Sequence, residues 1–320
     1  MKGKMYNLKN LCQMKERTLF DNLVKTLKKY YPEKNIKVKK YDYIFVEGKD
    51  KVMLNAHLDT VHHKTLINIF HDKAKNVIWS PEGIGGDDRC GVYAILKVLE
   101  ANYKPYILFT TGEESGGIGA YAFTDDFPKN EFNIKYIVGL DRRGVNDAVF
   151  YNIVNYDFID YILSYDFKEE YGSFSDISII SPSWEVCSVN LSVGYYHEHT
   201  KHEYIKVDHL QQTINKVINL IIDSKNIKKW KYKELKHYVQ YKVNYIIGYG
   251  NMDYENKRNK NKDKVDKDKS DKAIKYTFLC INCWQEYSIE NESLAESDLC
   301  IYCENIFLDD FNQISEYNRI

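Results

Sequence analysis

A histidine and an aspartate two positions apart, in the segment NAHLDTV, are the first residues whose types and spacing could do chemistry. The segment is predicted to be the end of a strand, where side chains alternate between faces, so His57 and Asp59 would point the same way. Asp59 would then accept the N–H of one imidazole nitrogen while the other nitrogen binds a metal ion. Such a triplet is common by itself, so it predicts a metal site only together with further ligands.

Two acidic pairs follow along the chain. In GIGGDDRCGV, Asp87 and Asp88 lie where a loop enters a predicted helix, so the pair could supply either a metal ligand or a helix cap. In FTTGEESGGIGA, Glu113 and Glu114 follow a buried strand, where carboxylates are costly unless they are solvated or bound to a cation. Adjacent acids can divide the work, one coordinating a metal and the other facing the bound water.

A last acid and a histidine-rich turn complete the pattern. Asp141 ends the apolar run VGLD, and the segment YYHEHTKHEYI precedes a predicted helix and contains His197 and His199. The motifs HxD, GDD, EE, D and HTxxE therefore occur in this order, a combination that is not expected by chance.

Together these motifs resemble those of the co-catalytic di-zinc peptidases, the clan that includes tripeptide aminopeptidase (peptidase T), the glutamyl aminopeptidases and the bacterial leucyl aminopeptidases. The resemblance covers about two thirds of the chain, roughly residues 15–225. It implies a site for two Zn²⁺ ions, with Co²⁺ or Mn²⁺ as possible substitutes, whose ligands are His57, Asp87, Glu114, Asp141 and His199.

The resemblance also implies a role for each residue. Asp87 would bridge the two ions, Glu113 would be the general base, and Asp59 would orient His57. His199 is assigned because Glu203 follows four residues later, as in the family's last motif, and His197 is the alternative ligand. The remaining histidines of this region are expected to be solvated loop residues: His62, His63, His71 and His202.

The sequence departs from the family between its fourth and fifth motifs. Many relatives insert a lid or dimerisation domain there, whereas only 57 residues separate Asp141 from His199. Any oxyanion donor that the lid supplies must then be replaced, and Tyr196 or its neighbour Tyr195 is a candidate, with aromatic packing as the alternative. Arg142 could clamp a substrate carboxylate, although a surface arginine in a turn fits the sequence equally well.

A second group of metal-binding residues lies near the end of the chain. Two CxxC pairs with sixteen residues between them match the spacing of a structural zinc ribbon holding one Zn²⁺: Cys280, Cys283, Cys300 and Cys303. The acidic ribbon segment favours a structural or protein-contact role over nucleic-acid binding. The isolated Cys12, Cys90 and Cys187 are expected to be small buried side chains.

Apolar periodicity predicts the elements that must position these motifs. Strands are predicted at 41–48 and 51–57, joined by a short turn, and at 105–111, 135–141 and 186–194. Helices are predicted within the first 30 residues, at 91–102, from 117, at 157–167 and at 206–223. This alternation predicts a three-layer α/β zinc-peptidase domain with a mostly parallel mixed sheet, whose carboxyl strand ends carry the motifs. The expected organisation is a catalytic domain at 1–225, a helical and charged linker at 226–275 and the zinc-ribbon segment at 276–320.

Composition limits the classes of function. Hydrophobic residues make up 44%, and 45 Lys+Arg against 46 Asp+Glu indicate neither a nucleic-acid nor a membrane partner. The first residues resemble no secretory signal, so a cytoplasmic location is expected.

The leading hypothesis is a metal-dependent exopeptidase, an aminopeptidase acting on short peptides. A deacylase of N-acyl amino acids with the same site is one alternative, and a non-catalytic adaptor acting through the ribbon is another. The oligomeric state is not indicated.

Overall fold

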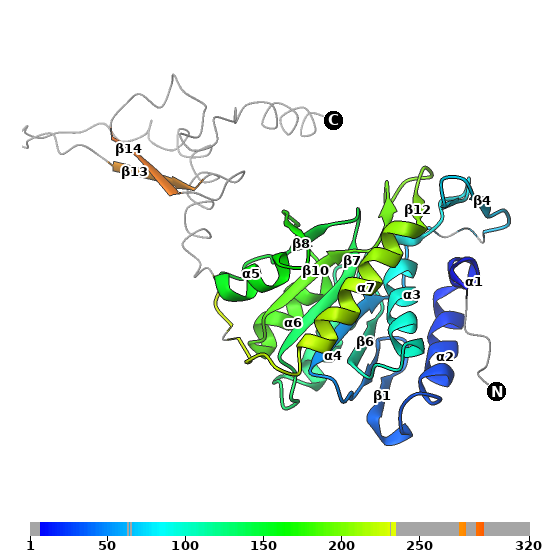
Figure 1. Ribbon diagram of the computed structural model, residues 1–320, viewed down its shortest axis with the longest axis horizontal. Coiled ribbons are helices and arrows are strands. Elements are labelled where there is room, and N and C mark those ends of the chain that lie inside the picture. The colour runs from blue at the N-terminus through cyan, green and yellow to red at the C-terminus, as the bar shows by residue number, and fades with distance from the viewer. Residues whose placement is uncertain are drawn as a thin grey trace, which may run out of the picture. The chain divides into compact units, whose positions relative to one another are not determined.

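A computed structural model describes residues 7–62, 64, 66–230 and 232–234, together with the backbone of residues 275–279 and 286–290 (Figure 1). The chain divides into two compact units, Met1–Leu235 and Lys236–Ile320.

The first unit is built on an eight-stranded sheet with the order β1-β2-β6-β3-β7-β10-β8-β9. Its strands are β1 (Ile36–Lys39), β2 (Tyr43–Val46), β3 (Val52–His57), β6 (Tyr106–Thr110), β7 (Tyr136–Arg142), β8 (Asp147–Val149), β9 (Lys168–Glu169) and β10 (Ser188–Ser192). The four central strands β6, β3, β7 and β10 are parallel to one another. The pairings of β1 with β2, β2 with β6 and β8 with β10 are antiparallel. The predicted mixed, mostly parallel sheet is confirmed.

Helices cover both faces of this sheet, which gives three layers. They are α1 (Leu8–Gln13), α2 (Glu16–Leu27), α3 (Gly86–Glu100), α4 (Ile118–Asp126), α5 (Tyr156–Leu163), α6 (Asp176–Trp184) and α7 (Val207–Asp223). Helices α3 and α7 lie side by side on one face, and α4 and α6 pack on the other (Figure 1).

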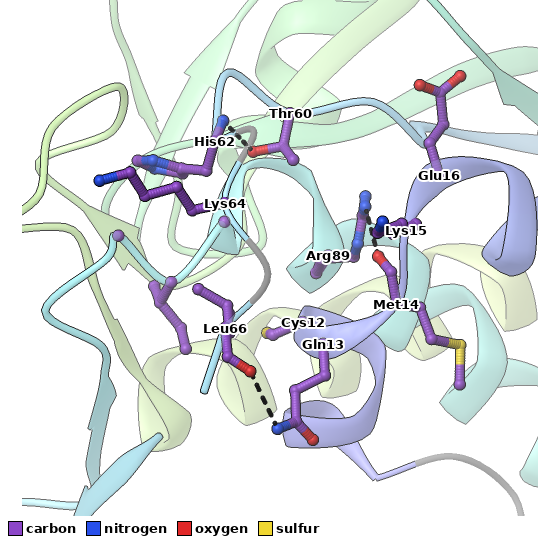
Figure 2. Close-up of a pocket in the computed structure, with 13 residues that line it drawn as sticks. Cys12, Gln13, Met14, Lys15, Glu16, Thr60, His62, Lys64, Leu66 and Arg89 are labelled. Carbon is purple, nitrogen blue, oxygen red and sulfur yellow. Dashed lines mark hydrogen bonds between the residues drawn. The ribbon is translucent and has the colours of Figure 1, made fainter. Parts of the chain in front are cut away.

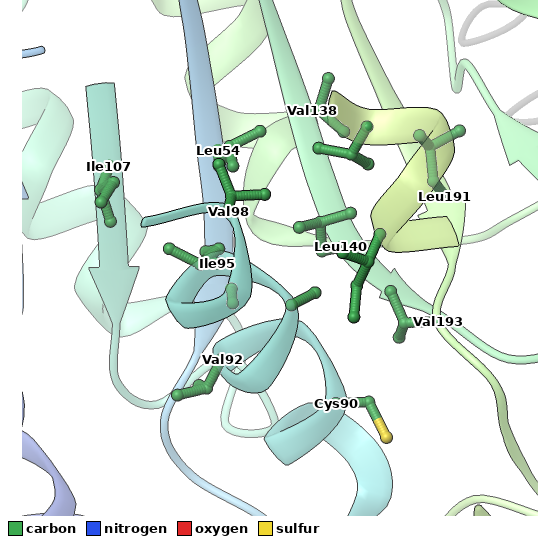
Figure 3. Close-up of a cluster of buried hydrophobic side chains, with 14 of the residues drawn as sticks. Leu54, Cys90, Val92, Ile95, Val98, Ile107, Val138, Leu140, Leu191 and Val193 are labelled. Carbon is green, nitrogen blue, oxygen red and sulfur yellow. The ribbon is translucent and has the colours of Figure 1, made fainter. Parts of the chain in front are cut away.

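The period-two alternation of strand side chains separates the core into two halves. Leu54 and Val138 belong to the cluster that faces α3, whereas their neighbours Met53 and Ile137 belong to the cluster around α4 and α6. Figure 3 shows the first cluster, in which apolar side chains of α3 lie against those of the strands. Cys90 is part of this cluster, and the thiols of Cys12, Cys90 and Cys187 are free and buried, as expected.

A short link joins β2 to β3, as predicted, but the two strands are not neighbours in the sheet, because β6 lies between them. The link between them passes the start of β6, where the backbone N–H groups of Lys49 and Asp50 donate to the carbonyl of Lys104 at 2.7 and 3.0 Å. The Asp50 carboxylate accepts the Lys104 N–H at 2.6 Å. Strands β2 and β3 are buried on both faces, so a third apolar strand between them completes their backbone hydrogen bonds.

A second, four-stranded sheet has the order β11-β12-β5-β4. Its strands are β4 (Phe70–Asp72), β5 (Val77–Trp79), β11 (Tyr195–Tyr196) and β12 (Tyr204–Lys206). Residues 197–203 connect β11 to β12 and contain the histidine-rich turn. None of these short strands was predicted from the sequence.

Residues 142–198 are all described, and they form β8, α5, β9, α6, β10 and β11. The strands β8, β9 and β10 belong to the main sheet, and the helices pack on it, so this segment is part of the first unit itself. No separate lid is formed by these residues.

The first unit continues past residue 225, where the linker was predicted to begin. Trp230 packs against Tyr136, Phe158 and Tyr161, and Ile153 forms an isolated bridge with Glu234.

In the second unit, β13 (Lys275–Leu279) pairs with β14 (Glu286–Glu290) in antiparallel register. The four cysteines of the predicted ribbon lie outside the described residues, so the ribbon stays a prediction. Among the described helices, none is long and apolar enough to cross a membrane.

Candidate metal centre

The predicted ligands converge at the carboxyl edge of the main sheet. His57 is the last residue of β3, Glu114 follows β6 and Asp141 lies near the end of β7. Asp87 lies at the start of α3, and His199 lies in the turn between β11 and β12. Parallel strands end at the same edge of a sheet, which brings together residues that are far apart in the sequence.

A first group of ligand atoms surrounds His57. Its Nε2 lies 2.9 Å from Asp87 Oδ1 and 3.3 Å from Asp141 Oδ1. Its Nδ1 lies 3.3 Å from Asp59 Oδ1. One imidazole nitrogen therefore faces two carboxylates, and the other is oriented by Asp59, as the HxD spacing predicted.

A second group surrounds His199. Its Nε2 lies 3.0 Å from Glu114 Oε2 and 3.3 Å from Asp87 Oδ2. The two oxygens of Asp87 thus face different histidines, which is the placement expected of a bridging carboxylate. His197 instead lies with its ring 5.6 Å from that of Tyr204 and has no close contact with these acids, so the structure places His199 at the cluster.

The two aspartates of the GDD motif have different surroundings. Asp88 lies within 4.8 Å of the ligand atoms of His57 and Asp141. Its oxygens, however, accept the backbone N–H of Gly91 at 2.7 Å and that of His57 at 3.3 Å. Regular helical backbone begins only after Asp88, so Asp88 caps α3 and Asp87 faces the cluster.

Asp59 also positions the glutamate pair. Its carboxylate accepts the backbone N–H of Glu113 at 3.2 Å and that of Glu114 at 3.0 Å. Burial and the charge of Asp141 raise the pKa of Glu113 to about 9. Burial and the charge of Asp87 raise the pKa of Glu114 to about 7. One aspartate therefore links the first histidine to the candidate base and to a ligand of the second group.

The cluster has the charge and the donor set of a cation site. Burial alone would lower the pKa of His57, but the Asp141 carboxylate and hydrogen bonds to the surrounding aspartates hold it well above its usual value. Buried carboxylates in such proximity cannot all ionise unless a positive charge offsets their repulsion. In this structure the histidine side chains supply that positive charge. Each group offers one imidazole nitrogen and carboxylate oxygens, a donor set that suits zinc.

Glu203 holds the backbone beside the cluster in place, a role that was not predicted from the sequence. Its side chain is 0% exposed, and its carboxylate accepts the backbone N–H groups of Gly85 at 2.8 Å and Asp87 at 2.9 Å. His62 Nε2 lies 2.8 Å from the same carboxylate. The prediction that His62 is a solvated loop residue is therefore wrong, since its side chain is 12% exposed and paired with a buried acid.

The other three histidines of this group differ from one another. The prediction that His71 is a solvated loop residue is also wrong, because His71 lies in β4, is half-buried and has its Nε2 3.0 Å from Asn76 Oδ1. His202 is exposed, as expected, and His63 lies outside the described residues. A spacing rule cannot separate His62 from these residues, because its partner Glu203 is 141 positions away.

Of the two candidate tyrosines, the structure brings Tyr195 to the cluster. The Tyr195 hydroxyl donates to Asp141 Oδ1 at 3.3 Å, and this side chain is buried. The ring of Tyr196 stacks on that of Tyr204, and its hydroxyl lies 2.5 Å from His209 Nδ1. Neighbouring strand residues point to opposite faces, so Tyr195, and not Tyr196, is the candidate that faces the cluster.

Arg142 is not among the residues that contact the cluster. Its Nε lies 3.5 Å from Asp147 Oδ2, and the side chain is 20% exposed. Binding a substrate carboxylate would require Arg142 to exchange this partner, so its predicted role receives no support from the geometry.

Polar residues of β10 and α6 hold Asp141 in place. Ser175 Oγ donates to Asp141 Oδ2 at 3.2 Å. The Asn190 side chain binds both the N–H of Asp141 at 3.0 Å and its carbonyl at 2.9 Å. Nearby, burial raises the pKa of Asp176 to about 7 even though Thr110 donates to it. The sequence offered no signal for Ser175 and Asn190, because neither lies in a chemical motif.

Arg89, which follows the two aspartates, is 1% exposed and ties the loop after β3 to the N-terminal helices. One of its terminal nitrogens, Nη1, donates to the Leu58 carbonyl at 2.6 Å, and the other, Nη2, donates to the Met14 carbonyl at 3.3 Å. Figure 2 shows it on the wall of a cavity of about 250 Å³, beside Met14 and Lys15. Its buried positive charge partly offsets the neighbouring acids.

Comparisons with known proteins identify the fold. No model of a known protein family matches the sequence, and no curated protein matches it either. Among solved structures, aminopeptidase PepT from Bacillus cereus matches with a TM-score of 0.54 at 16% identity, covering 68% of this chain and 97% of that chain. A tripeptidase from Staphylococcus aureus matches with a TM-score of 0.51 at 14% identity, covering 68% and 97%. The TET1 peptidase from Pyrococcus horikoshii matches with a TM-score of 0.51 at 13% identity, covering 67% and 98%. The first unit therefore has the fold of these peptidases, with a buried His/Asp/Glu cluster consistent with metal binding.

Proposed function

We propose that the protein is a metal-dependent exopeptidase, an aminopeptidase that hydrolyses short peptides. The observation that carries this proposal is Asp87, whose two oxygens face His57 and His199 at 2.9 and 3.3 Å with Glu113 close by. The likeness of the fold to an aminopeptidase and to a tripeptidase supports it.

The residues fit a pair of zinc ions. His57, Asp87 and Asp141 would hold one ion, and Asp87, Glu114 and His199 would hold the other, with Co²⁺ or Mn²⁺ as possible substitutes. Bound at these residues, the ions would supply a water of lowered pKa and would polarise the scissile carbonyl.

Glu113 is the residue placed to move protons. Its backbone N–H is held by Asp59, and its carboxylate belongs to the group formed with His57 and Glu114. It would accept a proton from the attacking water and return it to the leaving amine.

Several residues of this chain would keep the reacting groups in position. Asp59 orients His57 through Nδ1, and Glu203 fixes the backbone N–H of Asp87. Tyr195 and Ser175 donate to opposite oxygens of Asp141. Such supporting hydrogen bonds commonly change metal affinity or activity by roughly 10–100-fold when they are removed.

The strong concentration of acids suits a substrate with a free α-amine, because an ammonium or amine group is attracted by excess carboxylate. A deacylase would act on a blocked amine with the same site. An adaptor acting through the C-terminal segment would require no hydrolysis at all.

The experiment compares Leu-Gly-Gly with N-acetyl-Leu-Gly-Gly, using the full chain reconstituted with Zn²⁺ and the Glu113→Gln variant as control. Cleavage of the free peptide only, lost in Glu113→Gln, supports the proposal. Cleavage of the acetylated peptide only would establish the deacylase. Hydrolysis of neither, by protein of demonstrated metal content, would refute the hydrolase assignment.

A further inference from the structure

Two large apolar side chains are exposed where helices α4 and α6 begin. Ile118 is the first residue of α4 and is 54% exposed, and Phe174 lies two residues before α6 and is 41% exposed. The two helices pack together on one face of the main sheet (Figure 1). Because α4 follows the parallel strand β6 and α6 precedes the parallel strand β10, both helices begin at the carboxyl edge of the sheet, where the candidate metal centre lies. We call Ile118 and Phe174 the apolar pair.

Ile118 packs on the turn that contains Glu113. Its backbone N–H donates to the Gly112 carbonyl at 3.0 Å. A Cβ added to Gly112 would lie 3.0 Å from Ile118 Cβ and 3.2 Å from its Cδ1, so the isoleucine side chain lies directly over that glycine. Gly112 immediately precedes Glu113 in the sequence, and the exposed isoleucine is therefore next to the turn of the candidate base.

The ring of Phe174 contacts the other end of the same turn. A Cβ added to Gly117 would lie 3.0 Å from Phe174 Cζ, so the ring approaches the backbone closely because this residue has no side chain. The Gly117 N–H donates to the Glu113 carbonyl at 3.1 Å. The apolar pair therefore contacts both ends of the turn 112–117, which contains the candidate base and a candidate metal ligand.

Hydrogen bonds also tie the backbone of Phe174 to Asp141. The Tyr151 hydroxyl donates to the Phe174 carbonyl at 3.2 Å and accepts from Asn190 Nδ2 at 3.1 Å. Asn190 binds the backbone of Asp141, and Ser175, the residue after Phe174, donates to the Asp141 carboxylate at 3.2 Å. Phe174 is thus held on the side of the centre where Asp141 lies.

The acid closest to the ring is buried. Asp176 Oδ1 would lie 3.6 Å from a Cβ on Gly117, but Asp176 is 1% exposed and accepts a hydrogen bond from Thr110. A substrate side chain placed against the exposed ring of Phe174 would therefore meet apolar surface and not this carboxylate.

The turn 197–203, which brings His199 to the centre, presents polar groups instead. Its exposed residues include Thr200, Lys201 and His202. An apolar side chain buried there would desolvate polar and charged groups, whereas burial against the apolar pair removes apolar surface from water. The side of the centre at α4 and α6 is therefore the favourable one for an apolar substrate side chain.

We propose that Ile118 and Phe174 bind the apolar side chain of the N-terminal residue of the substrate. The carboxylates of the centre attract the free α-amine of a peptide. The side chain of that residue is bonded to the carbon that carries the amine, so it must lie against one wall of the centre. This assignment rests on the proposed peptidase function and specifies its substrates as short peptides that begin with an apolar residue such as leucine.

The test measures kcat/KM of the full chain with Zn²⁺ on Leu-Gly-Gly, Gly-Leu-Gly and Gly-Gly-Gly. The wild type is expected to prefer Leu-Gly-Gly to Gly-Gly-Gly by about 10–100-fold, which is the range for one apolar side chain in an apolar site, and to show no comparable preference for Gly-Leu-Gly. Phe174→Ala and Ile118→Ala each lower the ratio of Leu-Gly-Gly to Gly-Gly-Gly several-fold. A general loss of activity or of zinc cancels in this ratio.

Ile222→Ala is the matched control. Ile222 is 40% exposed near the end of α7, where the Leu220 carbonyl accepts the hydroxyl of Tyr136 from the start of β7, so it lies at the opposite edge of the sheet. The control keeps the wild-type ratio. A ratio that is unchanged in both Phe174→Ala and Ile118→Ala, or an equal preference for Gly-Leu-Gly, overturns the assignment and leaves the peptidase function standing.

Calorimetric titration of Leu-Gly-Gly into zinc-loaded Glu113→Gln protein, with and without Phe174→Ala or Ile118→Ala, separates the two proposals. Binding that either alanine variant weakens several-fold, without any hydrolysis by the wild type, supports the apolar pair and refutes the peptidase function. Absence of binding, or binding that neither variant changes, overturns the assignment. Because the two variants alter exposed side chains on different helices, the test does not depend on the folding of either one.

Discussion

Replacing Glu203 by alanine tests whether its buried carboxylate holds in place the loop that contains the GDD motif of the candidate metal centre. In the wild-type structure this carboxylate accepts the N–H groups of Gly85 and Asp87 and pairs with His62. The alanine variant leaves two buried N–H groups without an acceptor. Each unsatisfied buried group costs about 1–3 kcal/mol, so the expected loss is about 2–6 kcal/mol of unfolding free energy. Such a loss is large beside the 5–15 kcal/mol that is typical of a folded domain.

The matched control is Glu198→Ala, which removes a carboxylate of the same turn. Glu198 pairs with Arg143 at 2.7 Å, and the arginine side chain is 55% exposed, so this ion pair is worth about 0–1 kcal/mol. Urea unfolding of metal-free full-length protein, followed by circular dichroism, measures both variants. A loss in Glu203→Ala no larger than that in Glu198→Ala would refute the positioning role. Zinc titration provides a second readout, in which Glu203→Ala lowers affinity by roughly 10–100-fold.

Three further predictions follow from the same geometry. Glu113→Gln lowers kcat by about 10²–10⁴-fold, because it removes the proton acceptor, while the zinc content measured by mass spectrometry stays that of the wild type; loss of the metal together with the activity would contradict this. Metal-free protein becomes less stable as pH rises from 6.5 to 9. The pKa values of Glu113 and His199 are both raised to about 9, so the folded state binds more protons than the unfolded state across this range. The lowered pKa of Asp59 acts only near pH 4 and below. Thermal unfolding in a chelator measures the slope, and a stability that rises with pH would refute the assignment. Tyr195→Phe, which removes the donor to Asp141, lowers zinc affinity several-fold, whereas Tyr196→Phe leaves it unchanged; equal effects in a zinc titration would show that Tyr195 has no special role.

The parts of the fold that the sequence predicted are those with local signals. Apolar runs mark β3, β6, β7 and β10, and periodicity marks α2, α3 and α7. The order of the strands depends on pairings between distant segments, which is why the insertion of β6 between β2 and β3 was missed. The strands of the small sheet are two or three residues long, too short for any period to be recognised.

The residues of the candidate metal centre also divide into those with a local sequence signal and those without one. His57, Asp59, Asp87 and Glu114 could be singled out as candidates because they lie in motifs with glycines, strand ends and fixed spacings, and the resemblance to a family implied their roles. The choice of Tyr195 over Tyr196 required the direction of a two-residue strand, which no pattern in the sequence indicates. Polar supports such as Ser175, Asn190 and the pair of His62 with Glu203 act across long sequence separations, so only the folded chain brings them to the ligands.

The central claim is that one centre of this chain binds two metal ions through Asp87. The direct measurement is the zinc content of the full chain, of Asp87→Asn and of Glu113→Gln after exhaustive dialysis. Two ions at the centre and one at the four cysteines predict about three zinc ions in the wild type and in Glu113→Gln, and about one in Asp87→Asn. A wild-type content of one, unchanged in Asp87→Asn, would contradict the account.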